Sequence, residues 1–256
     1  MRLSVPRLRR VLLGAGFLAG MAAAFAAGMC FPARSPAVCT QADLTVRPDA
    51  APFSPAVSTM ATAETQPNAA LPEKWVCLTF DDGPNARYTP MLLDELKKRN
   101  IRASFFLIGE NIEGNEDILL QMRKDGHLIG NHTWDHVQLD KIPAEKARLE
   151  IEKTNNRIYE ASGIYPSYVR PPFGAWIKDM ELSVTMLPVF WDVDTLDWKS
   201  KNIDSILSIA QKQVHDGSII LMHDSYQTSV DAALKIADLF TEKGYVFVTA
   251  DQLLLT

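Results

Sequence analysis

The chain has 256 residues, of which 47% are apolar and 22% charged, and its formal net charge is −5 at pH 7. This is an ordinary globular balance with room for one sizeable core. Residues 73–256 carry 20 basic and 28 acidic residues. A net negative domain argues against nucleic acid or strongly anionic partners.

Residues 1–31 form an export signal. An uncharged run of 21 residues, Val11–Phe31, follows four arginines, Arg2, Arg7, Arg9 and Arg10. A cleaved signal peptide has an apolar core of roughly 7–15 residues and a spanning helix needs about 20, so a cleaved signal and a retained membrane anchor both stay open. In either case the arginines remain cytoplasmic. We therefore expect a protein that is secreted, or anchored in the membrane and facing outward.

Residues 32–72 are predicted to form a linker. They hold seven of the fifteen prolines, with Ala, Ser and Thr between them and no apolar periodicity. Such a composition cannot bury enough apolar surface to offset its ordering entropy, so we expect a disordered tether. The catalytic domain is predicted to occupy residues 73–256.

Strand and helix patterns alternate along that domain. Short apolar runs predict seven strands, at Trp75–Phe80, Ala103–Ile108, His127–Gly130, Tyr168–Val169, Leu187–Trp191, Ser218–Met222 and Tyr245–Val248. Helical periodicity predicts helices between them, at Tyr88–Lys98, Ile118–Lys124, Ala144–Ala161, Asp204–Val214 and Val230–Lys243. The alternation indicates parallel strands joined by helical crossovers. About seven strands favour an α/β fold of the small, distorted (β/α) barrel type.

Polar residues gather just past the predicted strand ends, which is the edge where parallel α/β folds bind ligands. They are Asp81, Asp82, His132, His136, Arg170, Asp194, Asp197 and His223. Two histidines four apart, at a helix start, can meet one metal ion, although surface or capping roles explain such a pair about equally well. Asp82 completes a three-ligand set, and Asp81 stands free to take a proton from water.

Three further segments have both structural and functional interpretations. Arg170-Pro-Pro-Phe-Gly174 is a rigid turn whose Phe173 N–H can serve an oxyanion. In Asp194-Thr-Leu-Asp197-Trp198 the tryptophan offers a flat wall, and Asp197 can pair with Arg170 or a histidine. His223, at the end of an apolar strand that includes Leu221, is a candidate general acid.

These segments, together with Thr79-Phe-Asp-Asp-Gly-Pro84 and His132-Thr-Trp-Asp-His136, resemble in order the five motifs of the polysaccharide deacetylase family. This family is also called the NodB-homology domain or carbohydrate esterase family 4. The resemblance covers the domain from Trp75 onward and none of the first seventy residues. One departure is Phe173, where the family commonly has tyrosine.

The resemblance implies a metal-dependent hydrolase that removes N-acetyl groups from amino sugars of a polysaccharide. It implies that Asp82, His132 and His136 bind one divalent ion, zinc or else cobalt, manganese or nickel. Asp81 would be the general base, oriented by Arg170, and His223 the general acid, tuned by Asp197. Trp198 and Leu221 would line the acetyl pocket, with Phe173 supplying the oxyanion N–H.

The expected partner is an acetylated polysaccharide, with peptidoglycan first and chitin oligomers or an exopolysaccharide also open. A linker of about forty residues would keep a tethered domain within reach of the cell wall. An O-acetyl xylan esterase and a non-catalytic glycan-binding domain are the alternatives. We expect a monomer.

Overall fold

The computed structural model describes residues 74–177, 180, 182 and 185–255. The signal and linker predictions for residues 1–72 lie outside these residues. No helix within the described part is long and apolar enough to cross a membrane.

The described residues form an all-parallel sheet. Its strands are β1 (Trp75–Gly83), β2 (Ser104–Leu107), β3 (Leu128–Asn131), β4 (Tyr168–Val169), β5 (Leu187–Pro188), β6 (Val193–Asp194), β7 (Ser218–His223) and β8 (Val246–Phe247). The strand order is β5-β4-β3-β2-β1-β7-β6, and β8 pairs with the start of β1. No pairing joins β5 to β6 among these strands, so the predicted distorted barrel is confirmed as one that backbone pairing does not close.

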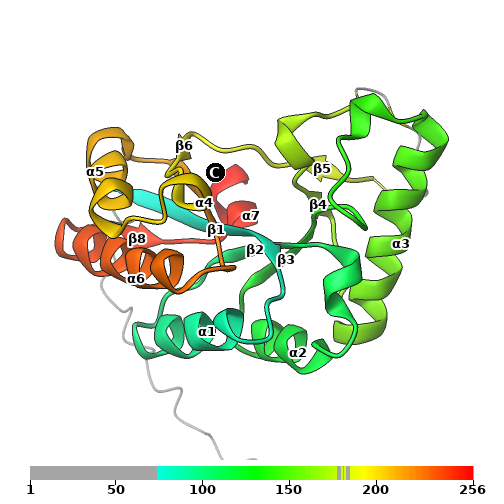
Figure 1. The fold of residues 1–256 in the computed structure, drawn as a ribbon. Helices are drawn as coiled ribbons and strands as arrows, with labels where there is room; N and C mark the ends of the chain where they lie inside the picture. The colour runs from blue at the N-terminus through cyan, green and yellow to red at the C-terminus, as the bar shows by residue number, and fades with distance from the viewer. Residues whose placement is uncertain (1–73, 178–179, 181, 183–184, 256) are drawn as a thin grey trace, which may run out of the picture. The chain divides into compact units, whose positions relative to one another are not determined.

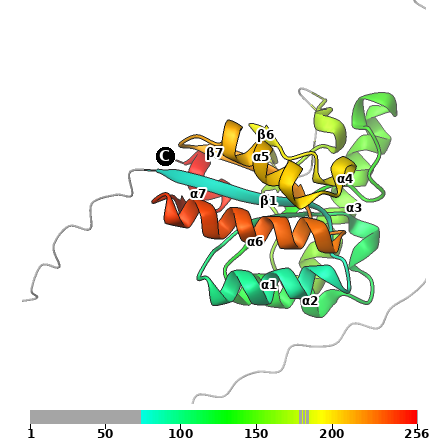
Figure 2. The ribbon, with the colours of Figure 1, turned by 60° about the vertical axis from the view of Figure 1, so that its left-hand side comes forward.

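Helices connect the strands and flank the sheet (Figure 1). They are α1 (Tyr88–Lys98), α2 (Glu116–Lys124), α3 (Ala144–Ser162), α4 (Asp197–Ser200), α5 (Ile203–Gln213), α6 (Gln227–Glu242) and α7 (Ala250–Leu254), with short 3-10 turns η1 (Gly109–Ile112), η2 (Leu139–Lys141) and η3 (Pro172–Gly174). The short helix α7 packs on the inner face of the sheet, where Ala250 joins a second apolar cluster with Cys77 and Phe106. Along the outside, α5 contacts α6, α6 contacts α1, α1 contacts α2 and α2 contacts α3. Figure 2 shows α6 running alongside β1.

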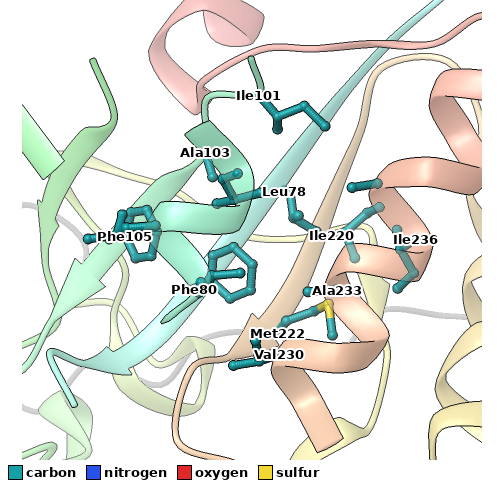
Figure 3. Close-up of a cluster of buried hydrophobic side chains, with 14 of the residues drawn as sticks. Leu78, Phe80, Ile101, Ala103, Phe105, Ile220, Met222, Val230, Ala233 and Ile236 are labelled. Carbon is teal, nitrogen blue, oxygen red and sulfur yellow. The ribbon is translucent and has the colours of Figure 1, made fainter. Parts of the chain in front are cut away.

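The main core lies between these helices and one face of the sheet. Side chains of a strand alternate between its two faces, and Val76, Leu78 and Phe80 of β1 all join this core. The apolar stripe of α6 packs against the same face and includes Val230, Ala233 and Ile236 (Figure 3). The opposite face of β1 turns Cys77, Thr79 and Asp81 toward the barrel interior. The alternation along β1 therefore separates a face that packs in the apolar core from a face whose side chains, including Thr79 and Asp81, point into the barrel.

The predicted strand Leu187–Trp191 is wrong in its extent. Only Leu187 and Pro188 pair with β4, and a separate strand, Val193–Asp194, pairs with β7 at the other end of the sheet. The intervening residues cross from one edge to the other. The Val189 N–H still donates to the Val169 carbonyl oxygen, but the carbonyl oxygens of Val189 and Phe190 accept from the Arg170 side chain and not from a strand. The apolar run therefore splits into two strands that the sequence pattern does not distinguish.

A buried histidine lies at the start of β3, away from the polar edge. His127 Nδ1 accepts the Ala103 N–H at 3.0 Å, the ring packs edge-on against Phe105, and the buried Nε2 has no partner. Burial lowers the pKa of His127 to about 4, outweighing the opposing effect of Asp125. The native fold thus holds this imidazole neutral.

This pKa predicts an acid-sensitive term in stability. The pKa of His127 in the native state lies below its ordinary value of about 6.5, so the unfolded state binds the extra proton. The free energy of unfolding therefore decreases as the pH falls from about 6.5 to about 4, by up to about 1.4 kcal/mol per pH unit. His127→Asn keeps an acceptor for the Ala103 N–H and removes the titration. Urea unfolding across this range should show a shallower decline for the variant. Equal slopes would contradict the assignment.

Candidate functional site

Three side chains with metal-ligating atoms converge at the carboxyl edge of the sheet. Asp82 Oδ1 lies 3.4 Å from His132 Nε2 and 3.4 Å from His136 Nε2. The three ligand atoms all lie within 4.8 Å of one another. Asp82 Oδ1 is itself buried without a hydrogen-bond partner. Two imidazole nitrogens and an unsatisfied carboxylate oxygen fit a divalent ion and leave coordination positions open.

Both aspartates belong to β1, which corrects the prediction that this strand stops at Phe80. The strand continues because Gly83 still pairs with Leu107 of β2. The register shifts between Asp81 and Gly83, and Asp82 is the extra residue, with φ at +71°. Such a bulge re-aims a side chain, and here it turns Asp82 toward the two histidines.

The two histidines lie on a turn and not at the start of a helix, as the sequence interpretation had it. Residues 132–136, called here the two-histidine turn, follow β3 directly, and Thr133 and His136 have φ of +67° and +62°. His132 Nδ1 lies 2.6 Å from the Arg170 carbonyl oxygen. That bond fixes the tautomer and leaves Nε2 facing the ligand position.

The protonation states of two of the ligands suit a metal. Burial alone would raise the pKa of Asp82, but the 3.4 Å approach of His132 and the charges of the nearby imidazoles outweigh burial and lower the pKa. Burial is the main cause that lowers the pKa of His136, with His132 contributing. An ionised carboxylate and a neutral imidazole are the forms that coordinate a metal ion.

Asp81 is the second carboxylate of the site and is almost fully buried. Its Oδ1 accepts from Arg170 Nη1 at 2.9 Å, and the same nitrogen donates to the Thr79 hydroxyl. Its Oδ2 lies 3.7 Å from His132 Nε2. One oxygen is thus held by the guanidinium while the other faces the ligand position, as orientation by Arg170 requires.

His223 is the last residue of β7 and lies next to Asp82. Its Nε2 lies 4.0 Å from Asp82 Oδ2, and its Nδ1 and backbone N each lie 2.9 Å from an oxygen of Asp197. Burial would lower the pKa of His223, but Asp197 first, and then Asp81 and Asp82, raise it to about 9. Of the two predicted partners for Asp197, the structure selects the histidine.

These residues surround one pocket of about 400 Å³. The lining includes the predicted Phe173, Trp198 and Leu221. Leu221 is buried, while Trp198 and Phe173 are 48% and 67% exposed at the rim. The Phe173 ring packs 4.9 Å from the His136 ring. Its backbone has φ of +59°, and an oxyanion role for its N–H stays a prediction.

Sequence reasoning did not assign Pro171, Trp191 and Asp194 to the pocket, although all three line it. Trp191 was placed in a strand because of its apolar neighbours, and Asp194 was placed at the ligand-binding edge but given no role there. The predicted metal, acid, base and wall residues do come together. Arg170 and Asp197 stand behind the pocket, in contact with Asp81 and His223.

Comparison with known proteins identifies the family. The family model described as Polysaccharide deacetylase matches residues 68–189. A peptidoglycan-N-acetylglucosamine deacetylase of Bacillus cereus is 39% identical over 188 residues, which cover 71% of this chain and 68% of that protein. The chain belongs to the polysaccharide deacetylase family.

Another relative is the peptidoglycan-N-acetylmuramic acid deacetylase PdaC of Bacillus subtilis, 40% identical over 181 residues. That match covers 71% of this chain but 39% of PdaC, so the chain spans about two fifths of the length of this relative. A solved structure of PdaC has a TM-score of 0.68 and covers 70% of this chain and 89% of that one. The deacetylase fold is therefore shared with a protein of closely similar sequence.

The three-ligand geometry predicts about one divalent ion bound per chain. His132→Ala removes one proposed ligand and also the neighbour that Asp82 contacts. The affinity for Zn²⁺ should therefore fall more than about 100-fold, which exceeds the loss of about 10–100-fold that is typical when a residue behind a metal ligand is removed. His215→Ala is the matched control, because His215 is exposed and its Nδ1 contacts only the neighbouring Asp216 carbonyl. Calorimetric titration measures both. Unchanged affinity in His132→Ala would refute the site.

Proposed function

We propose that this chain is a metal-dependent hydrolase that removes N-acetyl groups from amino sugars of peptidoglycan. The observation that carries the proposal is the placement of two candidate proton-transfer groups beside the three-ligand site, Asp81 at 3.7 Å from His132 and His223 at 4.0 Å from Asp82. Asp81 approaches the site from β1 and His223 from β7, strands that pair directly with Asp81 opposite His223. A binding-only domain has no need for either group.

The residues divide the reaction between them. The Asp81 carboxylate takes a proton from water as the water oxygen attacks the acetamide carbonyl carbon. His223, held protonated by Asp197, gives a proton to the amide nitrogen as the C–N bond breaks. The products are acetate and a free amine on the sugar. Arg170 orients Asp81 through the bond to its Oδ1, and Trp198 and Leu221 enclose the acetyl methyl.

Asp82, His132 and His136 would hold the metal ion, for which zinc is the first choice because two nitrogens and one carboxylate oxygen form a catalytic zinc set. Cobalt, manganese and nickel fit the same donors. When bound, such an ion supplies Lewis-acid polarisation of the substrate carbonyl and lowers the pKa of the attacking water. The backbone N–H of Phe173 is proposed as the hydrogen-bond donor that stabilises the negative charge on the carbonyl oxygen.

Peptidoglycan is the proposed polymer because the relatives from Bacillus subtilis and Bacillus cereus are named peptidoglycan deacetylases. The uncharged run behind the arginine cluster supports export, with a retained membrane anchor or a cleaved signal. We propose that the enzyme works as a monomer on the outer side of the membrane and does not bind nucleic acid. Cell fractionation tests this location.

A substrate panel tests the activity. Peptidoglycan fragments, chitooligosaccharides and acetylated xylan are incubated with the metal-loaded chain, and mass spectrometry follows the loss of acetyl groups. We expect loss from N-acetylated sugars, with peptidoglycan fragments preferred. Release from xylan alone would identify an O-acetyl esterase, and release from none, with binding retained, would identify a glycan-binding domain.

Separate variants distinguish metal binding from proton transfer. Asp81→Asn and His223→Ala should keep the metal, because neither side chain is a proposed ligand. Deacetylation should fall by about 10²–10⁴-fold, the range typical for a lost general acid or base. Calorimetry and acetate release measure the two properties on the same samples. Near-full turnover in His223→Ala would show that the proton comes from elsewhere.

A further inference from the structure

The two-histidine turn has an irregular backbone that depends on outside partners. Two of its residues, Thr133 and His136, have positive φ, which is uncommon for residues other than glycine. Residues 132–136 belong to no helix or strand, so the amides in the middle of the turn have no regular backbone partners. The Trp134 N–H is part-buried, and leaving a buried donor unsatisfied costs about 1–3 kcal/mol. The acceptors that this turn uses therefore determine whether its shape holds.

A single carboxylate oxygen accepts hydrogen bonds from two of these amides. Glu150 of α3 reaches the turn, and its Oε2 accepts the N–H of Trp134 at 2.9 Å and that of Asp135 at 3.2 Å. These are successive amides midway between His132 and His136. The contact therefore fixes the peptide planes that set the spacing of the two imidazoles.

Other contacts hold the turn against α3 and η1 but do not replace this one. Asn131 Oδ1 accepts the Thr133 N–H at 2.7 Å, and Asn131 Nδ2 donates to Asn155 of α3 at 2.7 Å. The Trp134 carbonyl accepts the Glu110 N–H at 3.0 Å. Among the described residues, only Glu150 is seen to accept from the amides at the centre of the turn.

We propose that Glu150 is a positioning residue for the metal site. It acts through the backbone of the two-histidine turn and sets the distance and orientation of His132 and His136. The inference rests on the three-ligand site of the proposed function and not on the substrate. Outer partners of metal ligands typically contribute 10–100-fold in affinity, which is about the effect expected here.

Three substitutions in the full-length chain, purified in detergent, separate the possible causes. Glu150→Ala removes the acceptor, and Glu150→Asp keeps the charge but is one methylene too short to reach both amides. Glu150→Gln keeps a carbonyl oxygen at full length and loses only the charge. Glu152→Ala is the control, because Glu152 lies two residues along α3 and pairs with Arg148.

Titration with Co²⁺ measures affinity by calorimetry and ligand geometry by visible absorption, without any substrate. Glu150→Ala and Glu150→Asp should bind Co²⁺ about 10–100-fold more weakly and change the absorption bands. Glu150→Gln should recover most of the affinity and the wild-type bands, and Glu152→Ala should match wild type in both. A purely structural role would change the melting temperature of the metal-free protein without changing the bands.

Wild-type affinity and bands in Glu150→Asp would overturn the proposal even if Glu150→Ala failed to fold. Wild-type chain that binds Co²⁺ but releases no acetate from any glycan would refute the proposed function and leave the role of Glu150 standing. The two failures are therefore distinguishable on the same protein samples.

Discussion

The structure depends on one buried cation, the guanidinium of Arg170, which has no exposed surface. A buried charge is costly unless it is paired and its donors are satisfied. Its Nη1 donates to Asp81 and Thr79, and the group lies 4.2 Å from the centre of the Phe106 ring and 5.8 Å from that of Trp191. The same pairing that offsets the cost of burying the Arg170 charge also fixes the orientation of the Asp81 carboxylate inside the barrel.

Arg170 also joins parts of the barrel that backbone pairing leaves apart. Its Nε and Nη2 donate to the carbonyl oxygens of Val189 and Phe190, at 3.2 Å each, in the segment that crosses between the two unpaired sheet ends. Its own carbonyl oxygen contacts His132 Nδ1. One residue thus helps to close the barrel, orients the proposed base and fixes the tautomer of a proposed metal ligand. The contacts of Arg170 that help to close the barrel thus come from the same residue as the contacts that arrange the site.

Much of this arrangement follows from sequence, because its signals are local. Alternation in β1 places Asp81 on the inner face, and short apolar runs followed by polar residues mark the binding edge. The errors come where backbone geometry departs from regular periods. The spacing of His132 and His136 suggested a helix, but positive φ at two residues of the turn brings them together instead. A turn of this kind has no periodic sequence pattern that would predict it. The role of Glu150 could not be predicted either, because this residue of α3 belongs to no motif, although its side chain accepts two hydrogen bonds from the turn.

The bulge in β1 explains how two adjacent aspartates serve one site. Strict alternation would place residue 82 on the same face as Val76, Leu78 and Phe80, where a carboxylate would be buried in the main apolar core. The extra residue in the register, with φ of +71°, rotates Asp82 out of that face. Asp81 keeps its inward direction and its guanidinium partner, so it remains a base. Asp82 gains the imidazoles as neighbours and keeps an oxygen without a hydrogen bond. The bulge therefore gives the two neighbouring aspartates different surroundings. A β1 without the bulge would lose the proposed metal ligand Asp82 and keep the proposed base Asp81.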